Sequence, residues 1–203
     1  MSGKMQICVC GWYYFPKFFD KLNLAVKQGY DVVVIRHRFG DVKGVRFVDR
    51  ENRGLEWGAY SFFLDTLWDG SSNVLFTQDD IQVTNNDFWK WCSNIKEDIC
   101  CIFNNQREAA YNSYAHGRML FISSKFLRVV KEDGGFWYDK HNTGFIAKGH
   151  YTTEKPPEGC SHHNAGIHRF TRMVARLRRK NPDIKKRTIL CSPYVRLGRR
   201  GVI

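Results

Sequence analysis

The chain has 203 residues, of which 43% are hydrophobic and 15% aromatic, and its formal net charge is +12. This composition excludes a disordered or collagen-like chain, and the length suffices for one large domain that buries its own core. No segment approaches eighteen consecutive apolar residues, and residues 1–4 lead directly into a strand-like segment rather than a secretion signal, so we expect a soluble, cytoplasmic protein without a transmembrane segment.

Strand and helix patterns alternate over the first 80 residues. Residues 6–10 form a short apolar run that Gly11 ends, and residues 18–26 show the helical spacing of apolar side chains up to Gly29. The other elements expected in this part are strands at 31–35, 45–48 and 73–77 and a helix at 57–67. The alternation predicts an α/β fold with a mainly parallel sheet and helices on both of its faces.

The second half of the chain continues the sheet and ends in a basic segment. The elements expected there are a helix at 88–92, strands at 99–103 and 119–123, a helix at 124–130, and loops over 133–163. Those loops are rich in Gly, Pro, His and aromatic residues, a composition that suits residues of a functional site. Residues 1–163 are predicted to form the main domain, and residues 164–203 a C-terminal extension packed on it.

The extension begins with an amphipathic helix, whose apolar side chains lie on one face and whose arginines lie on the other, and Asn181-Pro182 ends it. Residues 164–203 contain twelve Lys or Arg against one acid, Asp183, whereas residues 1–163 contain twenty against nineteen. Such an imbalance predicts a polyanionic partner, either nucleic acid or an anionic membrane surface, although a solvated charged face would give the same pattern. The candidate contacts are Arg169, Arg172, Arg176, Arg179, Lys185, Lys186, Arg187, Arg199 and Arg200.

The cysteines are predicted to be reduced thiols that act as small core residues. Their number is odd, several lie in strand-like apolar runs, and no Cys-x-x-Cys pair suggests a zinc site. They are Cys8, Cys10, Cys92, Cys100, Cys101, Cys160 and Cys191.

The expected strand at 73–77 runs directly into Gln78, Asp79 and Asp80. A buried parallel strand delivers the residues that follow it to the carboxyl edge of the sheet, where α/β proteins bind their ligands. Two adjacent carboxylates repel each other and are costly to bury, so a divalent cation between them and a ligand would stabilise them. An ordinary solvated turn is the alternative.

A second candidate segment precedes this strand and leads into the expected helix at 57–67. It contains Asn52, Arg53, Gly54, Glu56 and Gly58. Its glycines allow a close approach of backbone and ligand, its Asn and Arg side chains can bond a diphosphate or a base, and the N-terminus of a helix attracts anions. An ordinary loop that caps a helix would also fit.

Together these segments resemble glycosyltransferases of the GT-A fold, and small bacterial and phage-type enzymes above all. The resemblance rests on a first strand that ends in a nucleotide pocket, on Asn52-Arg53-Gly54 followed by Gly58-Ala59-Tyr60, and on Leu75-Phe76 followed by Asp79-Asp80-Ile81. It covers residues 5–130. The usual Asp-x-Asp motif of these enzymes begins with an acidic residue, and this chain has Gln78 there.

The resemblance implies a nucleotide-sugar donor, UDP-linked, and a divalent ion, Mn²⁺ or Mg²⁺, that neutralises the leaving diphosphate. It also implies that Asp80 binds this metal, with Asp79 beside it. The residues implied at the donor are Cys10, Gly11, Trp12, Arg36, His37, Asn52, Arg53, Glu56, Gln78 and Asp79.

A histidine from a late loop often completes the metal or diphosphate site of such enzymes, and His163 or His162 is the matching candidate. If the transfer inverts the sugar configuration, a carboxylate must take the proton of the acceptor hydroxyl, and Glu158, Asp139 and Asp79 are the candidates for this base. The resemblance leaves inverting and retaining transfer equally open.

A sugar-transfer site joined to an arginine-rich segment suggests that the acceptor is itself a polyanion. The leading hypothesis is transfer to a hydroxymethylated base in DNA, flipped out of the duplex, in a phage-like setting and hence in a host cytoplasm. One alternative is a lipid-linked or cell-surface glycan that the enzyme reaches from an anionic membrane. Another is a non-catalytic nucleic-acid-binding protein on a degenerate transferase fold. A metal nuclease is disfavoured, because no further acidic cluster would hold a second ion.

Overall fold

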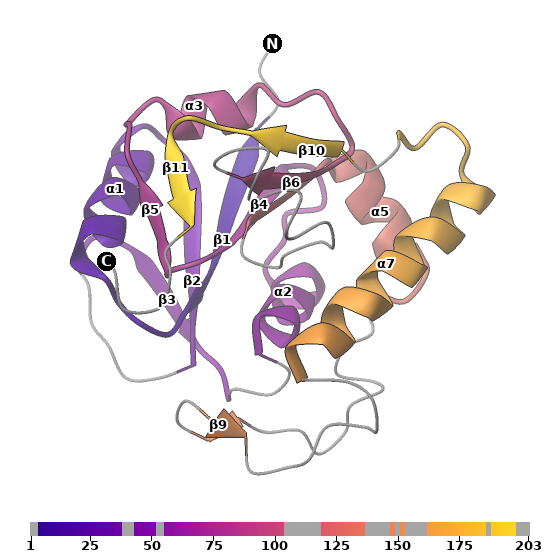
Figure 1. The fold of residues 1–203 in the computed structure, drawn as a ribbon, viewed down its shortest axis with the longest axis horizontal. Helices are drawn as coiled ribbons and strands as arrows, with labels where there is room; N and C mark the ends of the chain where they lie inside the picture. Colours follow the sequence, from indigo (N-terminus) through magenta and orange to yellow (C-terminus); the bar gives the residue numbers. More distant parts are fainter. Residues whose placement is uncertain are drawn as a thin grey trace.

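The centre of the molecule is a seven-stranded mixed sheet (Figure 1). Its strands, in spatial order, are β10 (Thr188–Cys191), β6 (Ile99–Phe103), β7 (Met119–Ile122), β4 (Asn73–Gln78), β1 (Met5–Gly11), β2 (Asp31–Arg36) and β3 (Arg46–Asp49). β7 is antiparallel to both of its neighbours, and every other pair in this sheet is parallel. The predicted α/β fold with a mainly parallel sheet is confirmed. The computed structural model describes residues 4–37, 43–51, 55–103, 119–136, 147–148, 151–152, 162–185 and 188–197.

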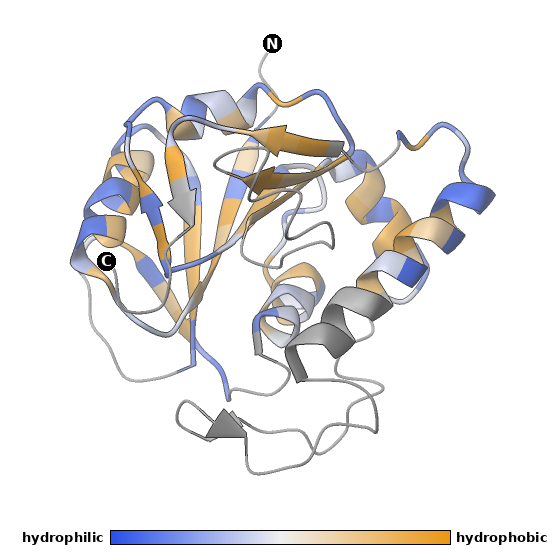
Figure 2. Ribbon diagram, viewed as in Figure 1, coloured by the Kyte–Doolittle hydropathy of each residue, from blue (hydrophilic) through white to orange (hydrophobic). Residues whose placement is uncertain are grey.

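Helices cover both faces of the sheet. The first face carries α1 (Pro16–Lys27) and α3 (Phe88–Ser93), and the second carries α2 (Leu55–Thr66), α5 (Ser124–Glu132) and α7 (His162–Lys180). Each face has its own buried hydrophobic cluster, because successive residues of a strand point to opposite faces. In β1, Ile7 and Val9 join the first cluster and Cys8 and Cys10 join the second. Figure 2 shows hydrophobic residues along the central strands, whereas the surrounding helices carry both hydrophobic and hydrophilic residues.

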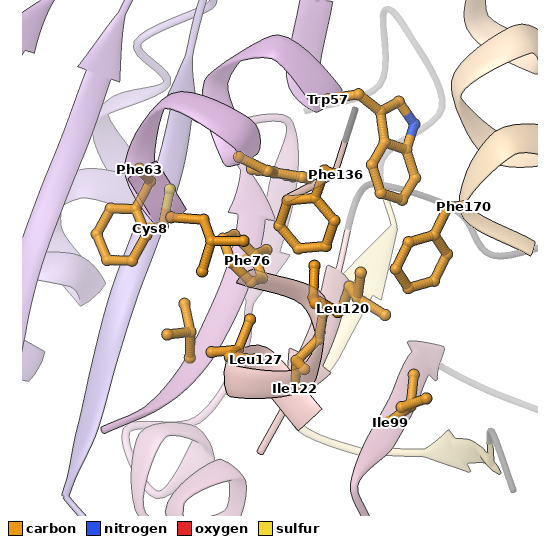
Figure 3. Packing of buried hydrophobic residues seen from close by; sticks show 14 of the residues in the cluster. Cys8, Trp57, Phe63, Phe76, Ile99, Leu120, Ile122, Leu127, Phe136 and Phe170 are labelled. Atoms are coloured by element: carbon orange, nitrogen blue, oxygen red, sulfur yellow. The ribbon is translucent and has the colours of Figure 1, made fainter. Parts of the chain in front are cut away.

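The core between α2, α5 and α7 is rich in aromatic side chains (Figure 3). The ring centroids of Trp57 in α2 and Phe170 in α7 lie 4.9 Å apart, and Phe136 lies 6.3 Å from Trp57 and 6.1 Å from Phe170. Such pairs contribute about 0.5–1.5 kcal/mol each beyond the apolar area that they bury. The three rings therefore fix α7 against the body of the protein.

The ends of the helices follow from the local sequence. Pro16 is the first residue of α1, where its missing N–H costs no hydrogen bond. Gly29 lies just beyond α1 with a φ of +87°, a conformation that glycine adopts without strain. Ser123 precedes α5, and its side chain accepts a hydrogen bond of 3.2 Å from the N–H of Phe126.

The basic C-terminal segment supplies a helix and two strands to this fold. The apolar face of α7 is buried as predicted, through Phe170, Met173, Val174 and Leu177. β10 pairs with β6 at one edge of the main sheet, and β11 (Val195–Leu197) pairs with β5 (Ile81–Val83), which directly follows the acidic pair. The sequence did not predict β5, β10 or β11. The division of the chain at residue 163 remains a prediction.

The other predicted elements are all present, with ends that differ by at most two residues. A short pair formed by β8 (Ala147–Lys148) and β9 (Tyr151–Thr152) lies in the region expected to be loops. Within the described ranges, no helix combines the length and the apolar character needed to cross a bilayer. Cys160 lies outside the described residues. The buried cysteines carry free thiols, as expected of small core residues, and are Cys8, Cys10, Cys92, Cys100 and Cys101, whereas Cys191 is exposed.

Candidate functional site

The candidate site lies at the switch point of the sheet, where the chain stops adding strands on one side of β1 and begins adding them on the other. From β1 the chain adds β2 and β3 on one side, and it then returns to add β4 on the other side of β1. α/β sheets bind ligands at the carboxyl ends of the strands that flank such a switch point. Cys10 and Gln78 are register partners there, so the loops after β1 and β4 begin side by side.

Asp79, the first residue after β4, holds the backbone of the loop after β1. Its Oδ2 accepts hydrogen bonds from the N–H groups of Trp12, Tyr13 and Tyr14, at 2.9, 2.7 and 2.7 Å. Three consecutive N–H groups converge on one point when the backbone curls, and Tyr14 has a φ of +57°, which is uncommon for a residue other than glycine. The carboxylate of Asp79 therefore fixes the shape of this loop.

The side chain of Asp79 is enclosed by protein. The residue is 0% exposed, and no described residue donates a hydrogen bond to its Oδ1. Burial raises the pKa of the Asp79 carboxyl to about 6, although the three N–H donors act in the opposite direction, and the neighbouring Asp80 raises this pKa further. A buried carboxylate with one such oxygen favours a cation beside it.

Asp80 and Glu56 bring two more buried carboxylates to the same end of the sheet. Asp80 is 6% exposed and directly precedes β5, and Glu56 is 5% exposed in the first turn of α2. Burial raises the pKa of the Cys10 thiol, and the charges of Glu56, Asp79 and Asp80 raise it further. All three acids therefore act on the carboxyl end of β1, and they make this region electronegative.

These carboxylates suit a hard divalent cation that also binds substrate. Within the part of the chain that the structure describes, no three His, Cys, Asp or Glu side chains are placed to hold a metal ion together. Mg²⁺ is often bound by one or two carboxylates together with substrate phosphates and water. Asp80, with the buried Oδ1 of Asp79 next to it in the chain, fits this second arrangement.

His37 follows β2 and lies beside the end of β1. Its Nδ1 is 3.9 Å from the Sγ of Cys10, and its backbone N–H donates to the carbonyl of Gly11. Burial lowers the pKa of His37 to about 3, and the positive charge of Arg50 lowers it further. The imidazole is therefore neutral near pH 7, and it can donate one hydrogen bond and accept another.

Two other residues predicted at the donor are engaged within the fold. A Cβ atom on Gly11 would lie 2.8 Å from the Cγ1 of Val34, so the close packing of β1 and β2 favours glycine here. Arg36 forms a two-point ion pair with Asp49, and its guanidinium lies 5.3 Å from the ring centroid of Phe47. The positive charge of Arg36 is thus already matched by a carboxylate.

Aromatic side chains line the loop after β1. The ring of Tyr14 packs beside those of Phe19 and Phe47, at centroid distances of 5.8 and 6.5 Å. Tyr13 stacks on Phe15 at 5.4 Å. Rings of this kind at the edge of a site can stack on a nucleobase.

The charged face of α7 holds two kinds of arginine. Arg172 and Arg179 are exposed, as the predicted outward row requires. Arg176 differs from that prediction, because it forms a two-point ion pair with Asp133 just after α5, and its charge is used within the protein. Lys185 is exposed beyond α7, and its ammonium group donates to a backbone carbonyl.

Several predicted residues lie outside the described residues, either wholly or in their side chains. They are Asn52, Arg53, Asp139, Glu158, Lys186, Arg187, Arg199 and Arg200, together with the side chains of His162, His163 and Arg169. The backbone of α7 begins at His162, so both histidines belong to its first turn. The roles of all these residues remain predictions.

Sequence reasoning missed the contact between Asp79 and the loop after β1. The bonded residues are 65 to 67 positions apart, and no local pattern indicates which oxygen accepts which N–H. The only available signal was that both segments follow strands expected to be parallel, and such segments meet at one edge of the sheet.

Comparisons with known proteins bear on the fold. Neither a protein-family model nor a curated protein sequence matches the chain. A solved glycosyltransferase involved in the glycosylation of the major capsid of PBCV-1 is similar, with a TM-score of 0.50 and 13% identity over 94% of this chain and 83% of that chain.

Two structures of Drosophila beta1,4-galactosyltransferase 7 are also similar. Its catalytic domain with xylobiose has a TM-score of 0.47 and 9% identity, over 92% of this chain and 64% of that chain. A mutant with manganese, UDP-Gal and xylobiose has a TM-score of 0.46 and 9% identity, over 97% and 71%. The likeness to the PBCV-1 enzyme concerns the fold alone, and it agrees with the GT-A-type arrangement of strands and helices that the sequence predicts.

Proposed function

We propose that the protein is a glycosyltransferase that uses a divalent metal ion and moves a sugar from a nucleotide-sugar donor to a hydroxyl group. The observation that carries this proposal is the buried pair Asp79-Asp80 at the carboxyl end of β4, beside β1 at the switch point of the sheet. The fold is that of a glycosyltransferase, and the same edge gathers the buried Glu56 and a neutral His37.

The metal ion, Mn²⁺ or Mg²⁺, would neutralise the diphosphate of the donor as it becomes the leaving group. We assign Asp80 as its main protein ligand, because the Oδ2 of Asp79 is committed to three backbone N–H groups. The Oδ1 of Asp79 and either His163 or His162, in the first turn of α7, are the further candidates. Since Gln78 replaces an acid of the usual motif, metal binding should depend on phosphate oxygens of the donor.

The nucleotide of the donor, UDP in this proposal, would bind at the ends of β1 and β2. The neutral imidazole of His37, beside Cys10, can bond a base or a ribose without adding charge. The loop that begins at Trp12 supplies aromatic rings. The residues around the start of α2 that remain candidates for the sugar and diphosphate are Asn52, Arg53 and Glu56.

We assign the catalytic base of an inverting transfer to Glu158 or Asp139 rather than to Asp79. A general base must reach the hydroxyl whose proton it takes. Asp79 is fully buried and its Oδ2 already accepts three hydrogen bonds, so it is poorly placed for an acceptor that arrives from solvent.

For the acceptor we propose a hydroxymethylated base in DNA. α7 carries no acidic residue, and Arg172, Arg179 and Lys180 are exposed on it. Contacts of such residues with phosphates would give a salt-dependent affinity that tolerates sequence, and base flipping would bring the hydroxyl to the site. A glycan acceptor at an anionic membrane surface is the alternative that the experiment must separate.

The experiment is a screen of sugar nucleotides for nucleotide release, with Mn²⁺ or EDTA, and with or without duplex DNA that contains hydroxymethylated pyrimidines. We expect turnover with a UDP-sugar, transfer of labelled sugar to the DNA, and no activity in EDTA. Asp80→Asn should reduce turnover by about a hundredfold or more, because a catalytic metal is worth several kcal/mol. Asp20→Asn, which changes an exposed acid of α1, is the matched control and should leave turnover unchanged.

The outcomes separate the parts of the proposal. If no donor releases its nucleotide with or without metal, the protein is not a glycosyltransferase, and DNA binding that survives Asp80→Asn would mark a non-catalytic binding protein. If turnover occurs and label reaches only glycans on anionic vesicles, the DNA acceptor alone is wrong.

A further inference from the structure

We propose that Asp79 is a positioning residue of the transferase site, whose Oδ2 sets the shape of the loop at residues 12–14 against which the donor nucleotide binds. The inference rests on the proposed function and adds to it a division of labour between two adjacent acids. Asp80 is the main protein ligand of the metal ion, and the Oδ2 of Asp79 orders the protein around the donor.

Asp79 connects the two loops that flank the switch point. The hydrogen bonds from Trp12, Tyr13 and Tyr14 end on one oxygen at 2.7 to 2.9 Å, so a single carboxylate fixes three successive peptide groups. The donors belong to the loop after β1, and the acceptor belongs to the segment after β4. A substitution of this carboxylate would therefore alter the backbone of residues 12–14, on the other side of the ligand-binding edge.

The conformation of the loop depends on this acceptor more than on the local sequence. Tyr14 has a φ of +57°, a region that residues other than glycine, Asn and Asp seldom adopt. Removal of the Asp79 carboxylate would break three part-buried hydrogen bonds at once and leave the three N–H groups without this acceptor. The loop would then be free to relax toward an unstrained conformation.

The ordered loop also decides how a donor can be bound. Successive backbone N–H groups in a curled segment form a concavity that attracts anions, and here Asp79 already fills it. The phosphates of the donor must therefore be neutralised elsewhere, while the loop offers its rings. Within this loop Tyr14 packs beside Phe19 and Tyr13 stacks on Phe15, and the half-buried Trp12 is the ring that we expect a nucleobase to contact.

Two substitutions at one position test the role. Asp79→Asn keeps an acceptor oxygen of the same reach, and Asp79→Ala removes it. In the metal-free protein, amide hydrogen exchange of Trp12, Tyr13 and Tyr14 should become at least about tenfold faster in Asp79→Ala and change little in Asp79→Asn. At saturating Mn²⁺, the KM for the donor should rise about tenfold in Asp79→Ala with kcat changed less than about threefold, and Asp79→Asn should restore most of this loss.

Further variants keep the test decisive. Trp12→Ala removes the ring but keeps the N–H, so it should raise the donor KM without faster exchange at Tyr13 and Tyr14. Trp91→Phe in α3 is the matched control and should change neither quantity. If Asp79→Ala does not fold, as circular dichroism will show, Asp79→Ser replaces it, because its hydroxyl is too short to reach the three N–H groups.

Unchanged exchange at the three amides in Asp79→Ala, or a donor KM equal to that of the wild type, would overturn the positioning role. An equal rise of the donor KM in Asp79→Asn and Asp79→Ala would also overturn this role. The charge of Asp79 would then be essential, rather than its acceptor oxygen. A wild-type protein that turns over no donor would contradict the proposed function, and the exchange measurement would still decide whether Asp79 orders the loop.

Discussion

Asp79 and Asp80 are neighbours in the sequence but have different partners. Asp79 accepts three N–H groups from the loop after β1, whereas Asp80 leads into β5, which pairs with β11. Both residues lie in the bend between β4 and β5, and the two adjacent acids need not share one ligand. A motif that resembles a pair of metal ligands therefore consists of a candidate ligand and an anchor.

The pKa shifts of Asp79 and His37 should give the metal-free protein two opposite pH dependences of stability. His37 has a pKa of about 3 in the folded state against an ordinary value of 6.5, so the unfolded chain takes up the proton first and stability falls as the pH drops below 6.5. Asp79 has a folded-state pKa of about 6 against an ordinary value of 3.8, so its contribution is present below 3.8 and is lost as the pH rises through about 6. Between pH 3.8 and about 6, the effect of His37 and the effect of Asp79 on stability therefore oppose each other.

Single substitutions should separate the two effects. His37→Gln removes the first, so this variant should gain stability relative to the wild type as the pH falls from about 7 to about 4.5, by up to about 1.4 kcal/mol per pH unit. Asp79→Asn removes the second, and its stability should fall more steeply than that of the wild type over the same range. Urea unfolding at several pH values measures both slopes. Parallel profiles for the three proteins would contradict these protonation states.

At the scale of the elements, α7 combines packing and charge. Its apolar face is buried, and the ion pair between Arg176 and Asp133 joins it to the end of α5. Lys125 of α5 pairs with Asp183 in the turn after α7. Two ion pairs therefore join α5 and the turn after it to α7 and the turn after that helix. Among the described side chains of α7, Arg172, Arg179 and Lys180 are exposed and can contact a partner.

A matched pair of substitutions on α7 separates structure from binding. Arg176→Gln should lower the free energy of unfolding by about 1 kcal/mol, because it breaks a partly buried two-point ion pair. Arg179→Gln should change that free energy by less than about 0.5 kcal/mol and should weaken DNA binding. Urea unfolding and fluorescence anisotropy with labelled DNA measure the two quantities. Equal losses of stability in both variants would show that the two arginines are not distinct.

The predictability of each element depends on whether its signal is local. Apart from β5, β8 and β9, apolar periodicity predicts the helices and strands up to α7, because their buried faces are encoded within each segment. β10 and β11 are short and lie among basic residues and prolines, and they become strands because β6 and β5 have edges that pair with them. Their signal is tertiary, so the sequence alone cannot reveal it.

The same distinction between local and tertiary signals applies to the candidate site. The position of Asp79 and Asp80 at the carboxyl edge was predictable, because every loop that follows a parallel strand lies at that edge. The function of Asp79 as an anchor was not predictable, since it depends on a three-dimensional register between segments 65 to 67 residues apart. The neutral state of His37 likewise depends on burial and on Arg50, which only the fold brings near it.

At the scale of the whole molecule, the net positive charge and the buried acids come from different parts of the sequence. Residues 164–203 carry almost all of the net charge of +12, whereas the acids Glu56, Asp79 and Asp80 cluster at the carboxyl edge of the sheet. A polyanionic acceptor would therefore be held by α7 and the residues after it, and only the modified base would need to approach the acids.

This separation predicts a definite salt dependence. The logarithm of the DNA affinity should fall linearly with the logarithm of the salt concentration, by about 0.9 per phosphate contacted. The double variant Arg172→Gln/Arg179→Gln should reduce the magnitude of this slope by about two, and Arg176→Gln should leave it nearly unchanged. A slope that the double variant does not alter would place the DNA-binding surface elsewhere.

Mn²⁺ binding with and without UDP tests most directly whether Asp80 and a donor nucleotide hold the metal together. Electron paramagnetic resonance reports the free ion, and UDP alone provides the baseline. We predict tight binding of Mn²⁺ by the wild type with UDP, weak binding without UDP, loss of the UDP-dependent gain in Asp80→Asn, and retention of that gain in Asp20→Asn. Binding that UDP does not strengthen, or that Asp80→Asn leaves intact, would contradict a metal-diphosphate site at the end of β4.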